Sequence, residues 1–245
     1  CKGINEFAVC ASSYQPWIDR KYDDDASAHP YIFHRLNPAW DKSRDHFWEY
    51  QARCAQLLQT GKPIIDILVF LGEDLPAKTM AFKLPEIPEG YSFDVCTPAS
   101  LRYWIQNKDT MAPDYKILVV QDRSIISEES ELLFDRLEKQ GIKIIRCDKG
   151  ETVDESLDRY GIGPDIRIKS EDRPDSKLHF CHRQNDDTDI YFIYNHSASE
   201  YLGDLSIRSG KTDIEIWNPL TSERSIAVTD TLSLKPYEAV FIIAR

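Results

Sequence analysis

The chain has 245 residues, 42% of them hydrophobic and 29% charged, so it is long enough to bury the cores of one or two domains. Its formal net charge of −11 argues against a general binder of nucleic acid or of anionic membranes. The longest apolar run, from about Ile64 to Leu71, has the length of a strand and falls well short of the ~20 residues that span a bilayer. We therefore expect no nucleic acid partner and no membrane span.

The cysteines predict free thiols. None of them forms a C-x-x-C pair, and four lie within or beside apolar strand or helix patterns. Buried thiols are therefore favoured over a disulfide framework or a zinc site. The six residues are Cys1, Cys10, Cys54, Cys96, Cys147 and Cys181.

The first quarter of the chain predicts one strand and one helix. Residues 6–12 form an apolar strand, and a long irregular stretch follows to about Trp40. Apolar residues at helical spacing then predict a helix over 43–60, which Gly61 and Pro63 end.

The middle of the chain alternates between strands and helices. Strands are predicted over 65–71, 92–96, 116–121 and 142–146, and helices over 98–106 and from Ser127 to 140. Ser127 is the expected N-cap of the second helix, since glutamates fill the first turn that follows it. This alternation predicts a small doubly wound sheet.

After Pro164 the pattern changes to short strands separated by turn residues. The predicted strands span 165–169, 178–183, 189–194, 205–208, 213–217, 225–229 and 239–244. Seven short strands at this spacing predict an antiparallel β-sandwich. The fold class is therefore α/β followed by all-β.

The α/β part lacks the usual signatures of nucleotide or acyl chemistry. No G-x-G-x-x-G and no P-loop occurs. Glu73 and Asp74 end the first strand of the sheet, at the edge where ligands bind in such folds, but carboxylates there also cap neighbouring helices. The turns at 121–124 and 94–97 lack the glycines of a nucleophile elbow. We therefore expect no catalytic nucleophile.

Residues that could bind a metal are poorly spaced. His29 and His34 are five apart in a loop, whereas His179 and His182 are three apart in a strand and point to opposite faces. The aspartates at 23–25 lack the alternating ligands and the glycine of a calcium loop. No metal site is expected in this chain.

The aromatic and amide residues of the first loop combine flat apolar faces with hydrogen-bonding groups. They are Tyr14, Gln15, Trp17, Asn37 and Trp40. Sugar rings stack on aromatic faces and bond their hydroxyls to amides. The tryptophans serve equally well as packing anchors of a long loop, so the residues alone leave both interpretations open.

Several stretches, taken in order, resemble the C-terminal part of glycoside hydrolase family 106, the α-L-rhamnosidases. The resemblance covers nearly the whole chain. The stretches are Gly3-Ile4-Asn5-Glu6-Phe7, Gln15-Pro16-Trp17, Asn37-Pro38-Ala39-Trp40, Tyr50-Gln51-Ala52-Arg53-Cys54, Phe70-Leu71-Gly72-Glu73-Asp74-Leu75-Pro76, Glu89-Gly90-Tyr91-Ser92-Phe93-Asp94 and Asp189-Ile190-Tyr191-Phe192-Ile193.

This resemblance implies a secreted or periplasmic multidomain enzyme, of which the chain is the C-terminal piece. Residues 1–62 would be the last strand, loop and helix of a (β/α)8 catalytic barrel whose N-terminal remainder is the missing partner. Residues 63–163 would form an amidotransferase-like α/β domain without a nucleophile, and residues 164–245 a β-sandwich. The whole enzyme would cleave a terminal glycosidic bond of an oligo- or polysaccharide with inversion. No cofactor is implied, and calcium is retained only as a candidate ion of the whole enzyme.

The resemblance also implies where the sugar would lie. The loop after the last barrel strand borders the active-site face, so Ser12, Tyr14, Gln15 and Trp17, with Asn37 and Trp40, are the expected sugar-binding residues. Cys10 and Tyr14 stand where family members often carry His, which indicates a changed specificity or even a changed activity.

No catalytic residue is assigned to this chain. The acid and base carboxylates of such enzymes come from earlier barrel strands, and Glu6 lies inside its strand rather than at the exit. We therefore expect the 245 residues to hydrolyse nothing alone.

Two other hypotheses remain. In one, the sandwich binds carbohydrate by itself, with Trp217 and Tyr201 as stacking platforms. In the other, both later domains are structural spacers that brace the barrel.

Overall fold

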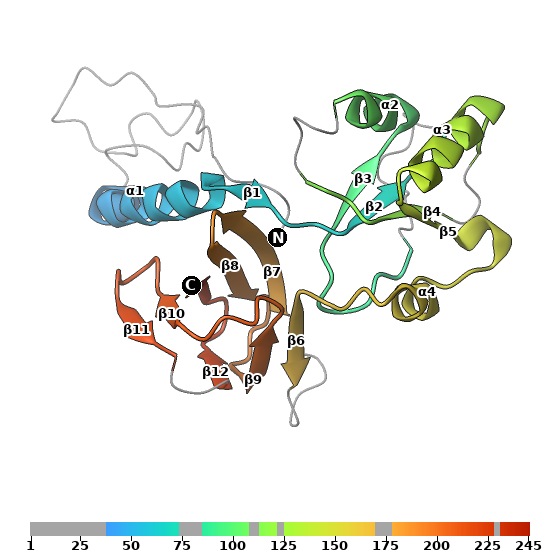
Figure 1. Cartoon of the computed structure of the whole chain (residues 1–245). Coiled ribbons are helices and arrows are strands. Elements are labelled where there is room, and N and C mark those ends of the chain that lie inside the picture. Colours follow the sequence, from blue (N-terminus) through green and yellow to red (C-terminus); the bar gives the residue numbers. More distant parts are fainter. Residues whose placement is uncertain (1–37, 74–84, 108–112, 122–124, 170–177, 228–230) are drawn as a thin grey trace, which may run out of the picture.

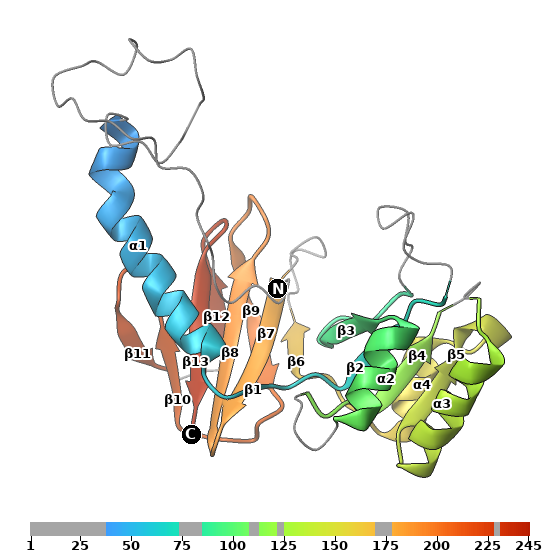
Figure 2. The same ribbon diagram turned by 90° about the horizontal axis from the view of Figure 1, so that it is seen from above.

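The computed structural model describes residues 38–73, 85–107, 113–121, 125–169, 178–227 and 231–245 (Figure 1). The strand predicted over 6–12 lies outside these residues. The described chain forms an α/β part and an antiparallel part, which lie next to each other and are joined at β1 and β6 (Figures 1 and 2).

The α/β part is a four-stranded parallel sheet in the order β3-β2-β4-β5. Its strands are β2 (Ile67–Phe70), β3 (Phe93–Cys96), β4 (Ile117–Val120) and β5 (Lys143–Arg146). Its helices are α2 (Pro98–Gln106), α3 (Glu128–Lys139) and α4 (Val153–Tyr160), with a short 3-10 turn at Cys147–Lys149.

Helices cover both faces of this sheet because its central strands are apolar at every position. Leu68 and Phe70 of β2 share a core with residues of α2 and α3, and the Phe70 ring lies edge-on to Phe134 at 5.1 Å. Ile67 and Val69 point the other way and pack with Leu157 of α4. The prediction of a buried parallel strand covered on both faces is confirmed.

The antiparallel part contains two sheets. One has six strands in the order β1-β7-β8-β13-β10-β11, and the other has three in the order β12-β9-β6. The strands are β1 (Lys62–Pro63), β6 (Ile166–Lys169), β7 (Leu178–Asn185), β8 (Thr188–Asn195), β9 (Tyr201–Ile207), β10 (Ile214–Trp217), β11 (Arg224–Ile226), β12 (Thr231–Leu234) and β13 (Ala239–Ala244). The inward residues of both sheets form one core, which includes Tyr191, Leu205, Leu234 and Ile242.

Helix α1 (Pro38–Gln59) covers the outer face of the six-stranded sheet (Figure 2). Its second half supplies Cys54, which is buried with Ile190, Phe241 and Ile243. The helix begins five residues before the predicted start at 43, so the expectation that an irregular stretch runs to Trp40 is wrong. Pro38 is the first helical residue, where the missing N–H of proline costs no helical hydrogen bond.

The expected succession of an α/β part and antiparallel strands is confirmed. Besides the earlier start of α1, the structure contains α4, β1 and β12, which were not expected, and β9 begins at Tyr201 instead of 205. The four cysteines among the described residues are free thiols, and Cys54 and Cys96 are buried. Within the described residues, no helix combines the length and apolar character needed to cross a membrane.

Candidate functional site

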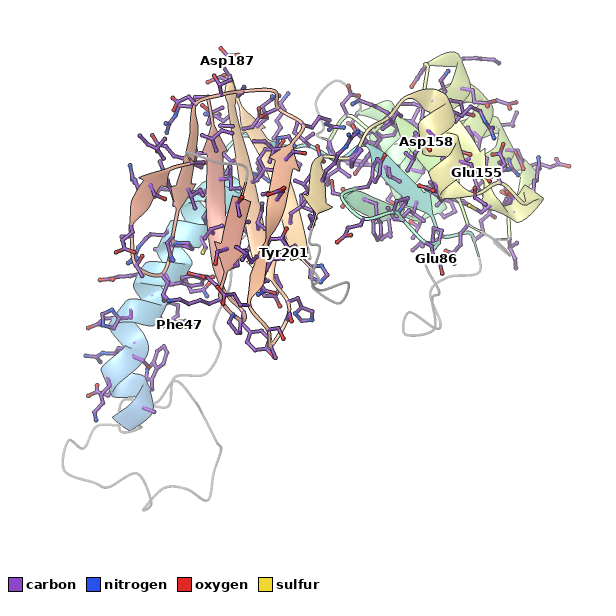
Figure 3. The ribbon with its side chains drawn as sticks, turned by 90° about the horizontal axis from the view of Figure 1, so that it is seen from below. Phe47, Glu86, Glu155, Asp158, Asp187 and Tyr201 are labelled. Carbon is purple, nitrogen blue, oxygen red and sulfur yellow. The ribbon has the colours of Figure 1, made fainter. Side chains whose placement is uncertain are left out.

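The predicted pocket residue Trp40 lies in the first turn of α1, at the end of the helix that projects beyond the sheets (Figures 2 and 3). The other predicted sugar-binding residues, Ser12, Tyr14, Gln15, Trp17 and Asn37, lie outside the described residues. The structure therefore locates only one of the six.

Trp40 is part of an aromatic cluster on α1, formed with Phe47 and Trp48. The Trp40 ring centroid lies 5.4 Å from that of Phe47 and 6.0 Å from that of Trp48, and both pairs are edge-to-face. Phe47 and Trp48 are 5.1 Å apart. Edge-to-face pairs fix ring orientations without burying every ring face, and Trp48 stays 44% exposed. This α1 aromatic cluster therefore exposes apolar surface at Trp48.

The two aromatic residues considered for sugar stacking in the sandwich are not available. Tyr201 is 1% exposed and belongs to the core between the sheets. The ring of Trp217 carries the Arg224 guanidinium 3.8 Å from its centroid, and its indole Nε1 donates to Glu215. Cation–π stacking occupies that ring face, so neither residue offers the open face that a sugar would need.

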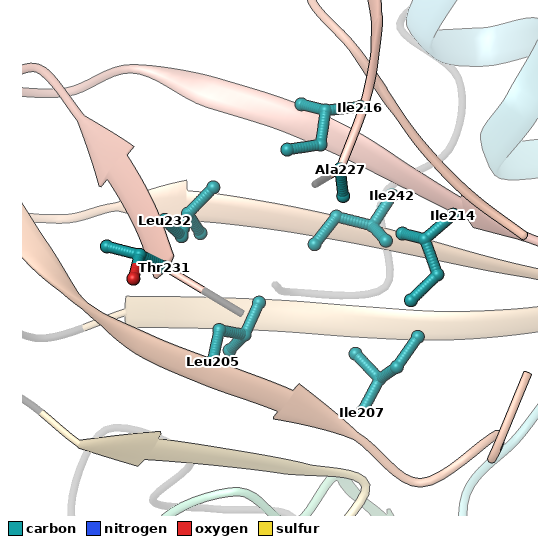
Figure 4. A pocket seen from close by; sticks show the side chains of 8 residues that line it. All are labelled: Leu205, Ile207, Ile214, Ile216, Ala227, Thr231, Leu232 and Ile242. Atoms are coloured by element: carbon teal, nitrogen blue, oxygen red, sulfur yellow. The ribbon is translucent and has the colours of Figure 1, made fainter. Parts of the chain in front are cut away.

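The apolar pocket at the open end of the sandwich also lacks the chemistry of a sugar site (Figure 4). Aliphatic side chains of both sheets line it, and Thr231 contributes the one hydroxyl group among them. Sugar recognition needs several convergent hydrogen-bonding groups.

At the carboxyl edge of the parallel sheet, Glu73 caps a helix. Its Oε1 atom accepts hydrogen bonds from the backbone N–H of Ser127 at 2.8 Å and from the Ser130 hydroxyl at 2.7 Å. Hydrogen bonds from Ser127 and Ser130 lower the pKa of Glu73. Ser127 is the N-cap of α3, as predicted, so the capping interpretation of Glu73 is confirmed. Asp74 lies outside the described residues.

The turn at 94–97 is likewise a helix cap. Thr97 and Ser100 form a capping box at the start of α2. Cys96 is 4% exposed, and burial raises the pKa of its thiol, which keeps it protonated and unreactive.

Sequence patterns missed a network of ion pairs around three buried carboxylates, which reaches from one part of the molecule to the other. We call it the junction network; it comprises Asp66, Lys116, Asp165, His182, Asp189, Arg208 and Lys211. Asp66 and Asp165 directly precede apolar strands and Asp189 is the second residue of one, which is the one signal that could have indicated them.

Arg208 is the link of the junction network that connects the two parts. It follows β9 and pairs with Asp66, which precedes β2, and its NH2 lies 2.7 Å from Oδ1 of Asp165. Burial alone would raise the pKa of Asp66, but hydrogen bonds from Arg208 and Lys116 hold that pKa below its ordinary value. Each buried carboxylate of this network is ion-paired, as structural charges are.

The two histidines of β7 face opposite sides of the sheet, as predicted. His179 stacks on Tyr194 on the outer face, and His182 stacks on Tyr191 on the inner face. No group of three or more metal-binding side chains is close enough to hold an ion within the described part of the chain.

Comparisons with known proteins agree with the resemblance in the sequence. The sequence model of the glycoside hydrolase 106 family, described as alpha-L-rhamnosidase, matches residues 1–147 and 122–229. A curated protein of Formosa agariphila named "Putative beta-glucuronidase" is 29% identical, over all of this chain and 24% of its own length.

Two solved structures share the fold. The rhamnosidase of Novosphingobium sp. PP1Y matches with a TM-score of 0.65 and 19% identity, over 84% of this chain and 25% of that chain. A beta-galactosidase of Bacillus circulans sp. alkalophilus matches with a TM-score of 0.52 and 8% identity, over 80% of this chain and 44% of that chain. This chain therefore spans about a quarter of the length of the Formosa protein and of the Novosphingobium rhamnosidase.

The family match extends over most of the chain, and the structural match preserves both parts of the fold. The chain belongs to glycoside hydrolase family 106, the α-L-rhamnosidase family.

Proposed function

We propose that this chain is the C-terminal piece of a longer rhamnosidase-like glycoside hydrolase and supplies scaffold and pocket wall, while the preceding part of the polypeptide supplies the catalytic carboxylates. The observation that supports the proposal is that the family model matches residues 1–229, while the chain spans about a quarter of the length of the Formosa protein and of the Novosphingobium rhamnosidase. The partner is a carbohydrate, and the expected location is secreted or periplasmic.

The proposed division of the chain follows from the family. Residues 1–62 would contribute the end of the catalytic barrel, residues 63–163 an amidotransferase-like domain that has lost its nucleophile, and residues 164–245 a β-sandwich. The capped carboxylate of Glu73 and the buried thiol of Cys96 support the loss of chemistry in the middle domain.

The buried charges support a scaffolding role. Asp66, Asp165 and Asp189 are each within ion-pair distance of a cationic side chain. A general acid or base needs a carboxyl group within reach of the substrate, whereas these three carboxylates are at most 5% exposed.

The pocket wall would come from the start of α1. The second half of the helix is fixed to the six-stranded sheet, while the first half carries Trp40 with Phe47 and Trp48 beyond that sheet. A helix that is fixed at its second half and carries Trp40 beside the 44% exposed Trp48 suits contact with sugar C–H faces.

The substrate would be a terminal α-L-rhamnoside or a β-glucuronide. The family description favours the rhamnoside, and the name of the Formosa protein is the reason to test the glucuronide as well. Turnover of the two aryl glycosides by the full-length enzyme distinguishes these substrates.

Substitution of Trp40 in the full-length enzyme tests whether the start of α1 forms part of the sugar pocket. We expect Trp40→Ala to raise KM for the aryl glycoside about tenfold while kcat changes less, because a stacking contact binds ground state and transition state alike. Tyr103→Ala is the matched control, since Tyr103 is a 59% exposed aromatic residue on α2. An unchanged KM in Trp40→Ala would show that Trp40 does not contact the substrate.

A further inference from the structure

The second half of α1 is joined to the six-stranded sheet by hydrogen bonds at two places. Where the helix ends, Arg183 of β7 donates to the carbonyl oxygen of Thr60 at 2.7 Å and to that of Gly61 at 2.6 Å. About two turns earlier, Nη1 of Arg53 donates to the carbonyl oxygen of Pro219 in the β10–β11 turn at 2.8 Å. Strand β7 and the β10–β11 turn lie on either side of β8 and β13, so these bonds hold the helix across the sheet.

The turn that accepts from Arg53 is itself held in place. Asn218, which follows β10, accepts with Oδ1 from the backbone N–H of Leu220 at 2.9 Å. The side-chain amide of Asn218 donates to Glu238, the residue before β13, at 3.0 Å. These bonds fix the backbone that carries the Pro219 carbonyl, so Arg53 donates to an acceptor whose position is set by the sandwich.

The guanidinium of Arg53 reaches both the turn and its own helix. Nη1 faces the turn, where the carbonyl oxygen of Leu220 lies at 3.5 Å, and Nη2 donates to Glu49 one turn earlier on α1 at 2.8 Å. A guanidinium presents its donors in fixed directions, so the Glu49 bond orients the group that reaches the turn. Arg53 therefore joins helix and turn in one geometry.

Apolar packing alone would fix the direction of α1 less well. The contact between the helix and the sheet includes Cys54, which packs with Phe241 and Ile243. Burial of apolar area is non-directional, so such a contact resists separation of the helix from the sheet more than it resists rotation about the contact. The hydrogen bonds of Arg53, the neighbour of Cys54 in the sequence, supply a directional restraint.

The length of the first half of α1 magnifies any change at Arg53. At a rise of about 1.5 Å per residue, Trp40 lies about 20 Å from Arg53 along the helix axis and about 30 Å from Thr60. If the helix pivots at Thr60, a shift of about 1 Å at Arg53 becomes a shift of about 3 Å at Trp40. A displacement of this size is enough to lose a contact with substrate.

We propose that Arg53 is a positioning residue. By bonding α1 to the β10–β11 turn, it sets the direction of the helix and with it the place of Trp40 in the sugar pocket. Arg53 does not touch the sugar and acts through the helix. The effect on the pocket rests on the function proposed above, whereas the effect on the direction of α1 does not.

The first test measures the direction of α1 without substrate. Spin labels on noncanonical amino acids leave the native thiols unmodified, and two exposed positions suit them: Lys42 in the first half of α1 and Ser225 in the edge strand β11. We expect a narrow distribution of label distances in the wild-type 245-residue protein. In Arg53→Met, the distribution should shift or broaden by about 3 Å.

Methionine is a suitable replacement because it keeps the apolar stem and the helix propensity of arginine while it removes every donor. Arg44→Met is the matched control, since Arg44 lies on the same helix and pairs with Asp41 of that helix. The control should keep the wild-type distances. A wild-type distribution in Arg53→Met would overturn the proposal.

A double-mutant cycle in the full-length enzyme tests the link to Trp40. We expect Arg53→Met to raise KM for the aryl glycoside about threefold, and to change KM little further in a protein that already carries Trp40→Ala. A role in stability alone would lower the amount of folded enzyme and leave KM unchanged. An unchanged KM in Arg53→Met, or a full additional rise on top of Trp40→Ala, would contradict the link.

The two tests distinguish this proposal from the pocket wall. If Trp40→Ala leaves KM unchanged, the wall is wrong, and the label distances still decide whether Arg53 sets the direction of α1. If Trp40→Ala raises KM while Arg53→Met changes neither the distances nor KM, the wall stands and Arg53 does not position it.

Discussion

Gly90 shows how one residue can fix the contact between the two parts. Its φ of 87° lies in the left-handed region, and a Cβ there would lie 2.1 Å from the carbonyl oxygen of Ile166. Gly90 O also accepts the N–H of Asp165 at 2.8 Å. The position therefore requires glycine for two independent reasons.

We predict that Gly90→Ala destabilises the protein far more than Gly141→Ala. Gly141 has a φ of 90°, but a Cβ there would meet no atom within 4 Å. Gly141→Ala should cost about 1 kcal/mol of unfolding free energy through backbone strain alone, and Gly90→Ala should cost several times as much. Urea denaturation of both variants measures the difference, and equal losses would show that the close approach to Ile166 does not exist.

Asp66 contributes to the response of the protein to acid. Its pKa is lowered because hydrogen bonds from Arg208 and Lys116 outweigh the effect of burial. The pKa of Asp189 is lowered in the same way, with Lys211 and His182 opposing burial. A lowered folded-state pKa gives stability that is present above about pH 4 and lost as the pH falls through the folded-state value.

We therefore expect Asp66→Asn to be less stable than wild type at neutral pH, by about 3 kcal/mol, because Arg208 loses a buried partner. The variant should also lose less stability than wild type between about pH 5 and 2. Thermal unfolding across this range measures both effects. Asp135→Asn, an exposed position on α3, serves as the control. An acid response in Asp66→Asn as steep as that of wild type would exclude Asp66 as its source.

Single residues were predictable where the signal was local. The N-cap Ser127 and the opposite faces of His179 and His182 follow from spacing alone. The partner of Asp66 was not predictable, because Arg208 is 142 residues away and carries no local sign of the pairing.

At the scale of elements, α1 is a helix with two environments. Cys54 in its second half is packed with Phe241 of β13, whereas Trp48 in its first half is 44% exposed. The second half of the helix is therefore packed against the six-stranded sheet, while its first half carries an exposed ring at Trp48.

We predict that Phe241→Ala lowers the unfolding free energy by about 3–5 kcal/mol, since it removes a fully buried ring under α1. Trp48→Ala should lower it by about 1 kcal/mol or less, as expected for exposed edge-to-face pairs. Chemical denaturation of the two variants measures this contrast. A loss of equal size for Trp48 would mean that the first half of α1 is also packed against the sheets.

Elements with strong local patterns were predicted well. The bounds of α2 match the prediction of 98–106, because Thr97 and Pro98 mark its start. Helix α4 was missed because its eight residues bury few apolar side chains. The start of β9 was missed because Gly203 and Asp204 resemble a turn, and strand β12 was missed as well.

At the scale of the whole molecule, the order of the parts was predictable and their contact was not. Strand–helix alternation and the later run of short strands indicated the two fold classes. The pairing of β1 with β7 and the Asp66–Arg208 pair of the junction network each join residues more than a hundred positions apart, which no local pattern reports. Sugar binding by Ser12, Tyr14, Gln15, Trp17 and Asn37 remains a prediction, and Trp40 is the one residue of this set that the structure locates.

The central claim is that this chain serves as scaffold and pocket wall for carboxylates that lie elsewhere in the polypeptide. Turnover of an aryl α-L-rhamnoside, measured side by side for the purified 245 residues and for the full-length protein, tests it most directly. We predict hydrolysis by the full-length protein and none by the 245 residues. Appreciable hydrolysis by the 245 residues alone would contradict the claim.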